Sequence, residues 1–458
     1  MAYECASARD ITGVPLPGSD EASAIELPDS GSDPIPNVSD LLALPDDALL
    51  EAVQTQTFRF FWQGAHGPSA LARDRHPYTA ARADLVATGG SGFGLMALVI
   101  AAERRWISRS AALERLGRAL QLLGRARTHH GALPHFIDGR SGETIPFMPR
   151  DDGGDLVETA LLCMGLICAR QYFNRDDIDE RQLREQINVV YGRVEWDWYA
   201  PAGSHGLYWH WSPTCAWALE HRIRGWNECL ITYVLAAGAP RHAIDPELYH
   251  QGFASGPEFR NGGRYYGIEL PLGPPLGGPL FFAHYSFCGL DPRGLSDRYA
   301  DYWLQNVNHV RINRQYCMAN PRQCIGYGAD CWGLTASDDP FGYVAHSPMV
   351  DTGTLSPTAA LASIPYAPVQ CLRLLRHLLA RYGERVWRRF GFVDAFCPQR
   401  EWFADSFLAI DQGPIVVMIE NYRSALPWRL FMSAPEVQRG LSRLGFRRAS
   451  PASPVPPA

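Results

Sequence analysis

The sequence predicts a largely helical fold in which helical hairpins pack around a ring, with long loops gathered at one end. Apolar residues recur at helical spacing in segment after segment of the chain. Between alternate segments run long connections rich in Trp, Tyr, Gly, His and Asp. Structureless connections of that length are uncommon unless they form a functional wall, so we expect the candidate chemistry to lie in them.

The expected helices follow one another along the whole body of the chain. They cover residues 40–61, 92–103, 108–128, 155–173, 179–191, 226–236, 295–311, 359–382 and 435–444. The segment 108–128 shows the pattern well, with Leu113, Leu116, Leu120 and Leu123 on one helical face. The long loops are expected over residues 195–227, 265–294 and 316–357.

One large domain is expected. At roughly 150 residues per domain, 458 residues would suggest about three domains, but no shift in composition divides the body. Residues 1–36 are rich in Pro, Gly, Ser and acid and are expected to be disordered or loosely packed. Residues 449–458 have the same character, which leaves 37–448 as a single domain.

Composition excludes several classes of function. The net charge is −6 and basic runs are absent, which argues against nucleic acid as a partner. All 42 basic residues are Arg, so a phosphate-loop lysine, a Schiff-base lysine and a lysine general base are excluded. No apolar run is long enough to span a membrane, and the N-terminus shows no secretory signal. No zinc-binding His spacing, serine-nucleophile elbow or dinucleotide fingerprint is found, so neither a metal nor a cofactor is expected.

The 11 cysteines are scattered, odd in number and without a CxxC pair, so no disulfide framework is expected. Several lie in apolar helical patterns and are typical of small core residues. Cys317, Cys324 and Cys331 share one loop, where a single bridge could form in an oxidising compartment.

Four carboxylates within eight positions stand directly before an apolar run: Asp151, Asp152, Asp155 and Glu158. An acidic helix start is favourable, but a cap needs one carboxylate rather than four. We expect Asp152 to be the cap and Glu158 to hold neighbouring backbone or an Arg. Asp151 and Asp155 then remain as candidates for chemistry. A calcium loop is a further interpretation, although the alternating ligand pattern is missing.

Glu228 is the second candidate, at the start of an apolar helix that follows an aromatic loop. A helix dipole would lower its pKa, whereas burial against Trp226 would raise it, as suits a catalytic acid. From the sequence alone, a lowered and a raised pKa of Glu228 both stay open. Two further groups of polar residues follow, Asp330 to Asp339 with His346 and Asp351, and Asp411 with Glu420 to Arg423.

Aromatic residues make up 11% of the chain, including 13 Trp, many of them in the loops. They either fill a large irregular core or line a cleft in which their faces stack on sugar rings. The modest net charge fits a neutral polar ligand.

Seven segments carry a family resemblance: FRFFW (58–62), GSGFG (90–94), GDLVETA (154–160), GWNE (225–228), CWGLTASD (331–338), DQGP (411–414) and ENYR (420–423). In this order they resemble the glucoamylase-like family, which includes the β-1,2-glucanases of glycoside hydrolase family 144. The resemblance covers about residues 50 to 435. It implies an all-α (α/α)6 toroid and a glycoside hydrolase that cleaves β-1,2-glucosidic bonds in β-1,2-glucan or sophoro-oligosaccharides.

By the same resemblance, Asp151, Asp155 and Glu228 match acidic positions of catalysis, with Glu228 as proton donor and an inverting reaction. The residues expected to bind substrate are Trp226, His284, Trp332, Asp338, Asp411 and Tyr422. The implied partner is a neutral glucan, and oligomeric state and endo or exo action stay open. Relatives work in the periplasm or outside the cell, although no signal is seen here.

Three rival functions remain at this point. A transglycosylase on the same glucans would need a covalent intermediate and a dry cleft. A glucan-binding toroid without turnover would not need three acidic residues together. A polysaccharide lyase would act on uronates, which an acidic cluster repels.

Overall fold

The computed structural model describes residues 34–449, so the expectations for 1–33 and 450–458 lie outside the described residues. That residues 37–448 form one domain stays a prediction. The described chain is rich in helix, and every strand in it is short. The helices are α1 (Val38–Ala43), α2 (Asp46–Trp62), α3 (Thr88–Glu103), α4 (Arg109–Arg125), α5 (Leu156–Tyr172), α6 (Ile178–Gly192), α7 (Leu230–Gly238), α8 (Tyr302–Ala319), α9 (Pro357–Ala362), α10 (Pro368–Tyr382), α11 (Ala409–Arg423), α12 (Leu426–Ser433) and α13 (Pro435–Arg443).

The strands form small sheets at the ends of the helices. They are β1 (Arg75–His76), β2 (Leu85–Ala87), β3 (Phe136–Asp138), β4 (Thr144–Ile145), β5 (Gly154–Asp155), β6 (His210–Trp211), β7 (Arg260–Tyr265), β8 (Ile268–Leu272), β9 (Leu295–Ser296), β10 (Ala336–Asp339), β11 (Gly342–Ala345), β12 (Trp387–Arg388), β13 (Gly391–Phe392), β14 (Phe396–Cys397), β15 (Trp402–Phe403), β16 (Phe407–Leu408) and β17 (Arg447–Arg448). The pairs are antiparallel: β1 with β16, β2 with β3, β3 with β4, β5 with β6, β7 with β8, β9 with β17, β10 with β11, β12 with β13 and β14 with β15.

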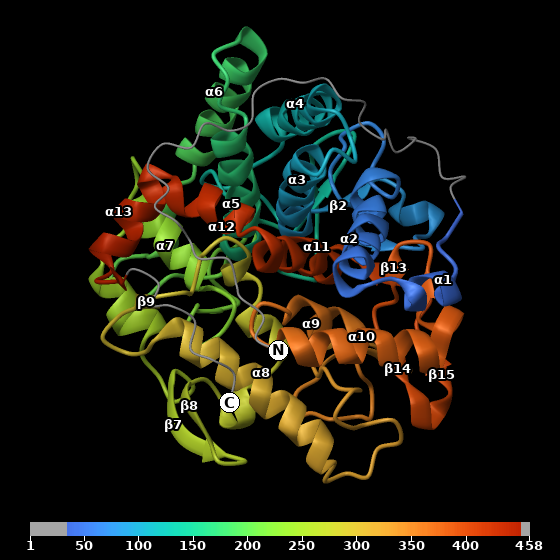
Figure 1. Ribbon diagram of the computed structural model, residues 1–458. Helices are drawn as coiled ribbons and strands as arrows, with labels where there is room; N and C mark the ends of the chain where they lie inside the picture. The colour runs from blue at the N-terminus through green and yellow to red at the C-terminus, as the bar shows by residue number, and fades with distance from the viewer. Residues whose placement is uncertain (1–33, 450–458) are drawn as a thin grey trace.

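Helices that are buried almost all round alternate along the chain with helices that keep one face in solvent. Helices α3, α5, α7, α9 and α11 belong to the first kind, and α4, α6 and α10 to the second. The amphipathic helices expose polar residues opposite an apolar stripe, as expected for outer helices. In Figure 1, α11 lies near the centre of the molecule while α4, α6, α8 and α10 lie toward its edge.

The buried helices contact one another in succession. Helix α3 contacts α5 and α11, α5 contacts α7, and α9 contacts α11. Between α7 and α9, two short 3-10 helices, η5 (Leu280–Ala283) and η6 (Ser286–Cys288), take the corresponding inner place. Ser286 joins this segment to α7, because its hydroxyl accepts a hydrogen bond from the N–H of Ile231 at 3.0 Å.

Helices α3 and α5 approach each other closely through glycine. A Cβ added at Gly165 would lie 2.1 Å from the carbonyl oxygen of Gly92, and one added at Gly92 would lie 2.1 Å from that of Leu161. Both positions are therefore restricted to glycine by the facing backbone.

We expect Gly165→Ala to lower the free energy of unfolding by about 1–3 kcal/mol, because the added methyl group overpacks a rigid backbone contact. Gly117 on α4 is the matched control, since an added Cβ there meets nothing within 4 Å. Gly117→Ala should raise stability by about 0.4–1 kcal/mol. Thermal unfolding of both variants checks this, and equal behaviour would contradict a close α3–α5 contact.

Several expected boundaries differ from the structure, and proline explains two of the differences. The first expected helix is two helices, α1 and α2, separated at Leu44 and Pro45. The expected helix 359–382 is divided into α9 and α10, and Pro368 starts the second. Helix α8 begins at Tyr302 rather than 295, and α7 begins at Leu230 rather than 226.

Helices α11 and α12 were not expected. Helix α11 contains Pro414, which normally signals the end of a helix, and its near-complete burial removes the amphipathic pattern. Within residues 34–449 every helix is too short or too polar to cross a lipid bilayer. All cysteines from Cys163 onward within this range are free thiols.

Candidate functional site

Asp155 is the N-cap of α5. Its Oδ1 accepts hydrogen bonds from the N–H groups of Val157 (3.0 Å) and Glu158 (2.9 Å). Its Oδ2 accepts hydrogen bonds from His135 Nδ1 (3.1 Å) and Trp209 Nε1 (3.2 Å). Because four donors occupy both oxygens of this buried carboxylate, its geometry is fixed.

The expectation that Asp152 caps the helix is wrong. Strand β5 ends at Asp155, so the last extended residue before the helix, where a cap must lie, is three positions further along. Asp152 instead accepts hydrogen bonds from the hydroxyls of Ser212 (2.5 Å) and Thr214 (2.7 Å). Burial alone would raise the pKa of Asp152, but these two hydrogen bonds lower it below its ordinary value. Asp152 thus fixes the loop that follows β6.

Glu158 holds backbone, as expected. Its Oε2 accepts a hydrogen bond from the N–H of Gly89 at 2.6 Å, in the first turn of α3. Burial, reinforced by the charge of Asp155, raises the pKa of Glu158 to about 7. The charge of Glu158 in turn acts on His135: burial lowers the pKa of this histidine, but Glu158 and the hydrogen bond to Asp155 outweigh burial and raise it to about 9.

Asp151 differs from Asp155 in keeping an oxygen without a hydrogen-bond donor among residues 34–449. This oxygen, Oδ1, lies 3.1 Å from His210 Nε2, without the alignment of a hydrogen bond. The side chain is 14% exposed, against 1% for Asp155. Burial first, and then the charge of Asp155, raise the pKa of Asp151. Asp151 is therefore the more accessible carboxylate of the two.

Glu228 stands just before α7 rather than inside it. Gly225 adopts a positive φ of 79°, which turns the chain so that Trp226 enters the core two residues before Glu228. The carbonyl oxygen of Glu228 accepts a hydrogen bond from the hydroxyl of Ser286, and the N–H of Cys229 donates to Asn227 Oδ1 at 3.0 Å. These contacts fix the backbone on both sides of the carboxyl group.

The structure resolves the two opposed expectations for the pKa of Glu228. Burial raises it to about 7, and the charges of Glu158 and Asp155 add to the effect. The side chain remains partly exposed. A half-buried carboxyl group that holds its proton near neutral pH suits a general acid. Because Glu158 and Asp155 both act on it, Glu228 belongs to the same acidic cluster although it lies about seventy residues away in sequence.

A second group of carboxyls adjoins this cluster. Asp394 and Asp411 are buried and hydrogen-bond to each other. Burial raises the pKa of Asp394 to about 7 and that of Asp411 well above its ordinary value. Two carboxylates so close cannot both ionise, so the pair holds a proton between them. The backbone N–H of Asp338 donates to Asp394 Oδ2 at 2.7 Å, and the Tyr285 hydroxyl donates to Asp411 Oδ1 at 3.4 Å.

Sequence reasoning missed Asp394. It stands alone in an apolar stretch, Phe392 to Phe396, where an unaccompanied Asp gives no spacing signal. A single Asp among core residues is itself unusual, and that was the available hint. Tyr285 connects the two groups, because its pKa is raised first by burial and then by charges that include those of Asp411 and Glu228.

Three of the expected substrate-binding residues are buried, and the fourth, Tyr422, lies at the far end of α11. His284 nevertheless lines the same small cavity as Tyr285 and Asp411. Trp226 and Trp332 are core residues, 2% and 1% exposed. His284 is equally buried, and its Nε2 hydrogen-bonds to Ser363 Oγ at 2.9 Å. Burial lowers its pKa to about 3. Tyr422 is in the last turn of α11, whereas Asp411 is in the first, so the two lie at opposite ends of the helix.

Two hollows flank the carboxyl groups. One, of about 450 Å³, is lined by His221 and its neighbours. The ring of His221 stacks on Trp209 (4.7 Å, 10°), whose indole donates to Asp155. The other, of about 630 Å³, includes Asp338 and Tyr343 in its wall. Among residues 34–449 no cluster of His, Cys, Asp and Glu is arranged to hold a metal ion.

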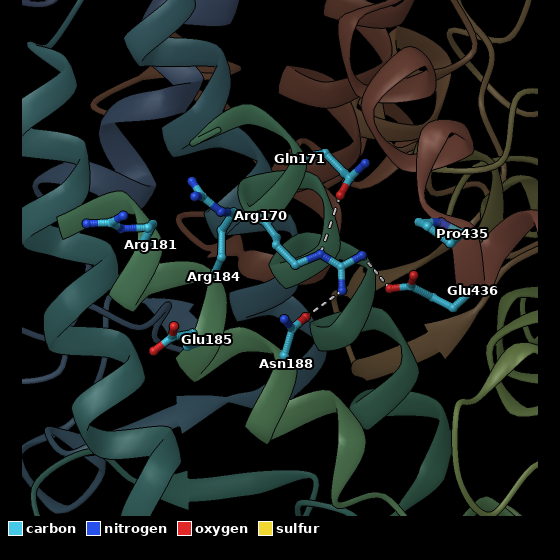
Figure 2. A pocket seen from close by; sticks show the side chains of 8 residues that line it. All are labelled: Arg170, Gln171, Arg181, Arg184, Glu185, Asn188, Pro435 and Glu436. Carbon is cyan, nitrogen blue, oxygen red and sulfur yellow. Dashed lines mark hydrogen bonds and ion pairs between the residues drawn. The ribbon is translucent and has the colours of Figure 1, made fainter. Parts of the chain in front are cut away.

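A third hollow, of about 520 Å³, lies between α5, α6 and α13, and three of its eight lining residues are Arg (Figure 2). Arg170 reaches across it to Glu436 (2.5 Å) and to Asn188 (2.7 Å). Its guanidinium is thus used in joining helices, and the nearby carboxylate of Glu436 is held in an ion pair with it.

The chain was compared with known proteins. The family model Glycoamylase, described as "Putative glucoamylase", matches residues 220–435. The structure of an endo-β-1,2-glucanase from Chitinophaga pinensis, in complex with sophorotriose and glucose, superposes with a TM-score of 0.86. It is 46% identical, and the match covers 88% of this chain and 99% of the other. The chain belongs to the glucoamylase-like family.

Two further matches are a curated sequence relative and a solved structure of low sequence identity. A curated glucoamylase-like relative, the exo β-1,2-glucooligosaccharide sophorohydrolase (non-reducing end) of Parabacteroides distasonis, is 44% identical over 422 residues. The match covers 88% of this chain, which spans only 58% of that relative. An endo-β-1,2-glucanase from Talaromyces funiculosus, 12% identical, shares the fold with a TM-score of 0.61, over 92% of this chain and 98% of its own.

Proposed function

We propose that this protein is a glycoside hydrolase that cleaves β-1,2-glucosidic bonds in β-1,2-glucan or its oligosaccharides. One observation carries the reaction class: Glu228 is a partly exposed carboxyl group whose pKa burial raises to about 7, and the charge of Asp155 acts both on it and on Asp151. Glycoside hydrolysis needs such a pair, one carboxyl that holds a proton and one that does not. The substrate class rests on the relatives, whose names specify β-1,2-linked glucans.

Within this proposal Glu228 protonates the oxygen of the departing sugar. Asp151 is the proposed base, because its carboxylate, 14% exposed, is the one of the two that water can reach. Asp155 is the fixed cap that holds His135 and Trp209 beside the site. We propose inversion, in which the two carboxyls stand about 6.5–9.5 Å apart to admit that water. The anomeric form of the first product, followed by NMR, decides this point.

We also propose that the buried helices close into an (α/α)6 toroid within one catalytic domain, residues 37–448. The supporting observation is the succession of contacts from α3 through α5 and α7 to the η5–η6 segment, α9, α11 and back to α3. Six inner elements alternating with outer helices would make up such a ring. It would bring Asp155, Glu228 and Asp411, each at the N-terminal end of an inner helix, to one end of the domain.

The test of function is a product assay on linear β-1,2-glucan beside laminarin, cellulose and starch. We expect release of reducing ends from the β-1,2-glucan alone. Mass spectrometry of the products separates hydrolysis from transglycosylation, since the latter gives longer or cyclic glucans. Activity on starch alone would overturn the substrate assignment, and binding without release would indicate a glucan-binding protein.

A further inference from the structure

The hollow of about 630 Å³ lies among three short hairpins on the Asp338 side of the carboxyl groups. The β10–β11 hairpin supplies Asp338 and Tyr343, which pair across the two strands and so present their side chains to the same face. The opposite wall consists of Trp402 in β15 and Asp405 in the loop that follows. This volume is within the roughly 300–1,000 Å³ of small-molecule sites.

Some polar groups of the hollow already have hydrogen-bond partners, and others have none among the described residues. Asp338 is satisfied, since it accepts hydrogen bonds from Arg75 (3.2 Å) and from the Ser406 hydroxyl (2.5 Å). Asp405 is exposed, and its carboxylate has no hydrogen-bond or ion-pair partner among residues 34–449. The indole N–H of Trp402 likewise has no partner among the described residues. The free donor and the free acceptor stand on the same wall.

The aromatic surfaces are available as well. Tyr343 is 52% exposed, and Trp402 in the other wall is half-buried. An aromatic face next to a carboxylate and an N–H donor offers both apolar and hydrogen-bonding contacts, which is the combination that a sugar ring presents in return. The pocket is too open and too polar to be a core defect.

The hollow adjoins the second group of carboxyls through Asp338, whose backbone N–H donates to Asp394 Oδ2 at 2.7 Å. Asp394 pairs with Asp411, which lies in the first turn of α11. In the proposed toroid, this end of α11 and Glu228 lie at the same end of the domain. A glucan chain bound at Glu228 and extended along that end would meet the hollow.

We propose that the hollow between the β10–β11 hairpin and the β15–β16 loop is a glucosyl-binding subsite that holds the substrate chain beyond the unit next to Glu228. Tyr343 and Trp402 stack on the sugar, and Asp405 accepts hydrogen bonds from its hydroxyls. This inference rests on the proposed function and adds a chain-length preference to it, because a chain too short to reach the hollow gains nothing from these groups.

The experiment compares polymeric linear β-1,2-glucan with sophorotriose as substrates of the full-length chain. For Trp402→Ala and, separately, Asp405→Ala, we expect the ratio of kcat/KM on the polymer to kcat/KM on the trisaccharide to fall by about tenfold, the effect of losing one good polar or aromatic contact. Asp405 is exposed, so its replacement leaves folding intact even where Trp402→Ala does not.

Tyr266→Ala is the matched control, an exposed aromatic residue in the β7–β8 turn, outside the walls of this hollow. Its ratio should equal that of the wild type. An unchanged ratio in both test variants, or an equal loss on both substrates, overturns the subsite. A wild-type protein that releases nothing from either substrate overturns the proposed function instead, so the two failures are distinguishable.

Discussion

Replacement of Glu228 by glutamine is expected to reduce reducing-end release from β-1,2-glucan by about 10²- to 10⁴-fold, the usual contribution of a positioned acid. Glutamine has the same shape and keeps the backbone contacts to Ser286, but it cannot give up a proton to the departing oxygen. The loss should appear in kcat more than in KM, because the acid acts on the transition state.

The control for this variant is Glu114→Gln on the outer surface of α4, where the side chain is 75% exposed. It should match the wild type in both rate and melting temperature. Glu228→Gln should keep the melting temperature of the wild type or exceed it, since it removes a buried acidic group. Near wild-type activity in a folded Glu228→Gln variant would remove Glu228 from the mechanism.

The pH dependence follows from the same carboxyl group. Burial raises the pKa of Glu228 from its ordinary value to about 7, and the reaction requires its protonated form. Activity should therefore fall as pH rises through about 7, instead of near the ordinary pKa of Glu. Any residual activity of Glu228→Gln should lack this decline, and a decline that persists in the variant would assign it to another group.

The outer helices could be predicted from sequence because their burial is one-sided. Helix α4 combines a leucine stripe with a Ser108 cap, and its predicted and observed bounds differ by a few residues. Helix α11 could not be predicted in the same way, since it is apolar on nearly every side and contains Pro414. Tertiary burial, rather than local pattern, stabilises it.

The carboxyl residues of the candidate site could be named from the sequence, but the structural role of each could not. The charges of Glu158 and Asp155 add to the raised pKa of Glu228, and the catalytic roles that the family resemblance implied for Glu228, Asp155 and Asp151 stay predictions. The cap was misassigned because one short strand, β5, carries the extended backbone past Asp152 to Asp155. Loop aromatics such as Trp226 were expected to face substrate, but loops of this length fold back and fill the core.

Replacement of Asp151 by asparagine is expected to affect stability and rate differently from replacement of Asp155. Asp151→Asn removes a carboxylate whose Oδ1 has no hydrogen-bond donor among the described residues, and it also removes the repulsion from Asp155. We expect the free energy of unfolding to change by less than about 1 kcal/mol, while kcat falls by about 10²- to 10⁴-fold. Thermal unfolding and initial rates on β-1,2-glucan measure the two effects independently.

Asp155→Asn should behave differently, because asparagine keeps the cap through Oδ1 but replaces Oδ2 by an amide that itself donates. That amide would face the N–H groups of His135 and Trp209, and both would lose their acceptor. The expected cost is about 2–4 kcal/mol of folding free energy, accompanied by loss of activity. If Asp155→Asn were as stable as the wild type and inactive, while Asp151→Asn kept its rate, Asp155 would be the base. The donors that surround its carboxylate argue for the opposite result, since a base must have an oxygen free to receive the proton from water.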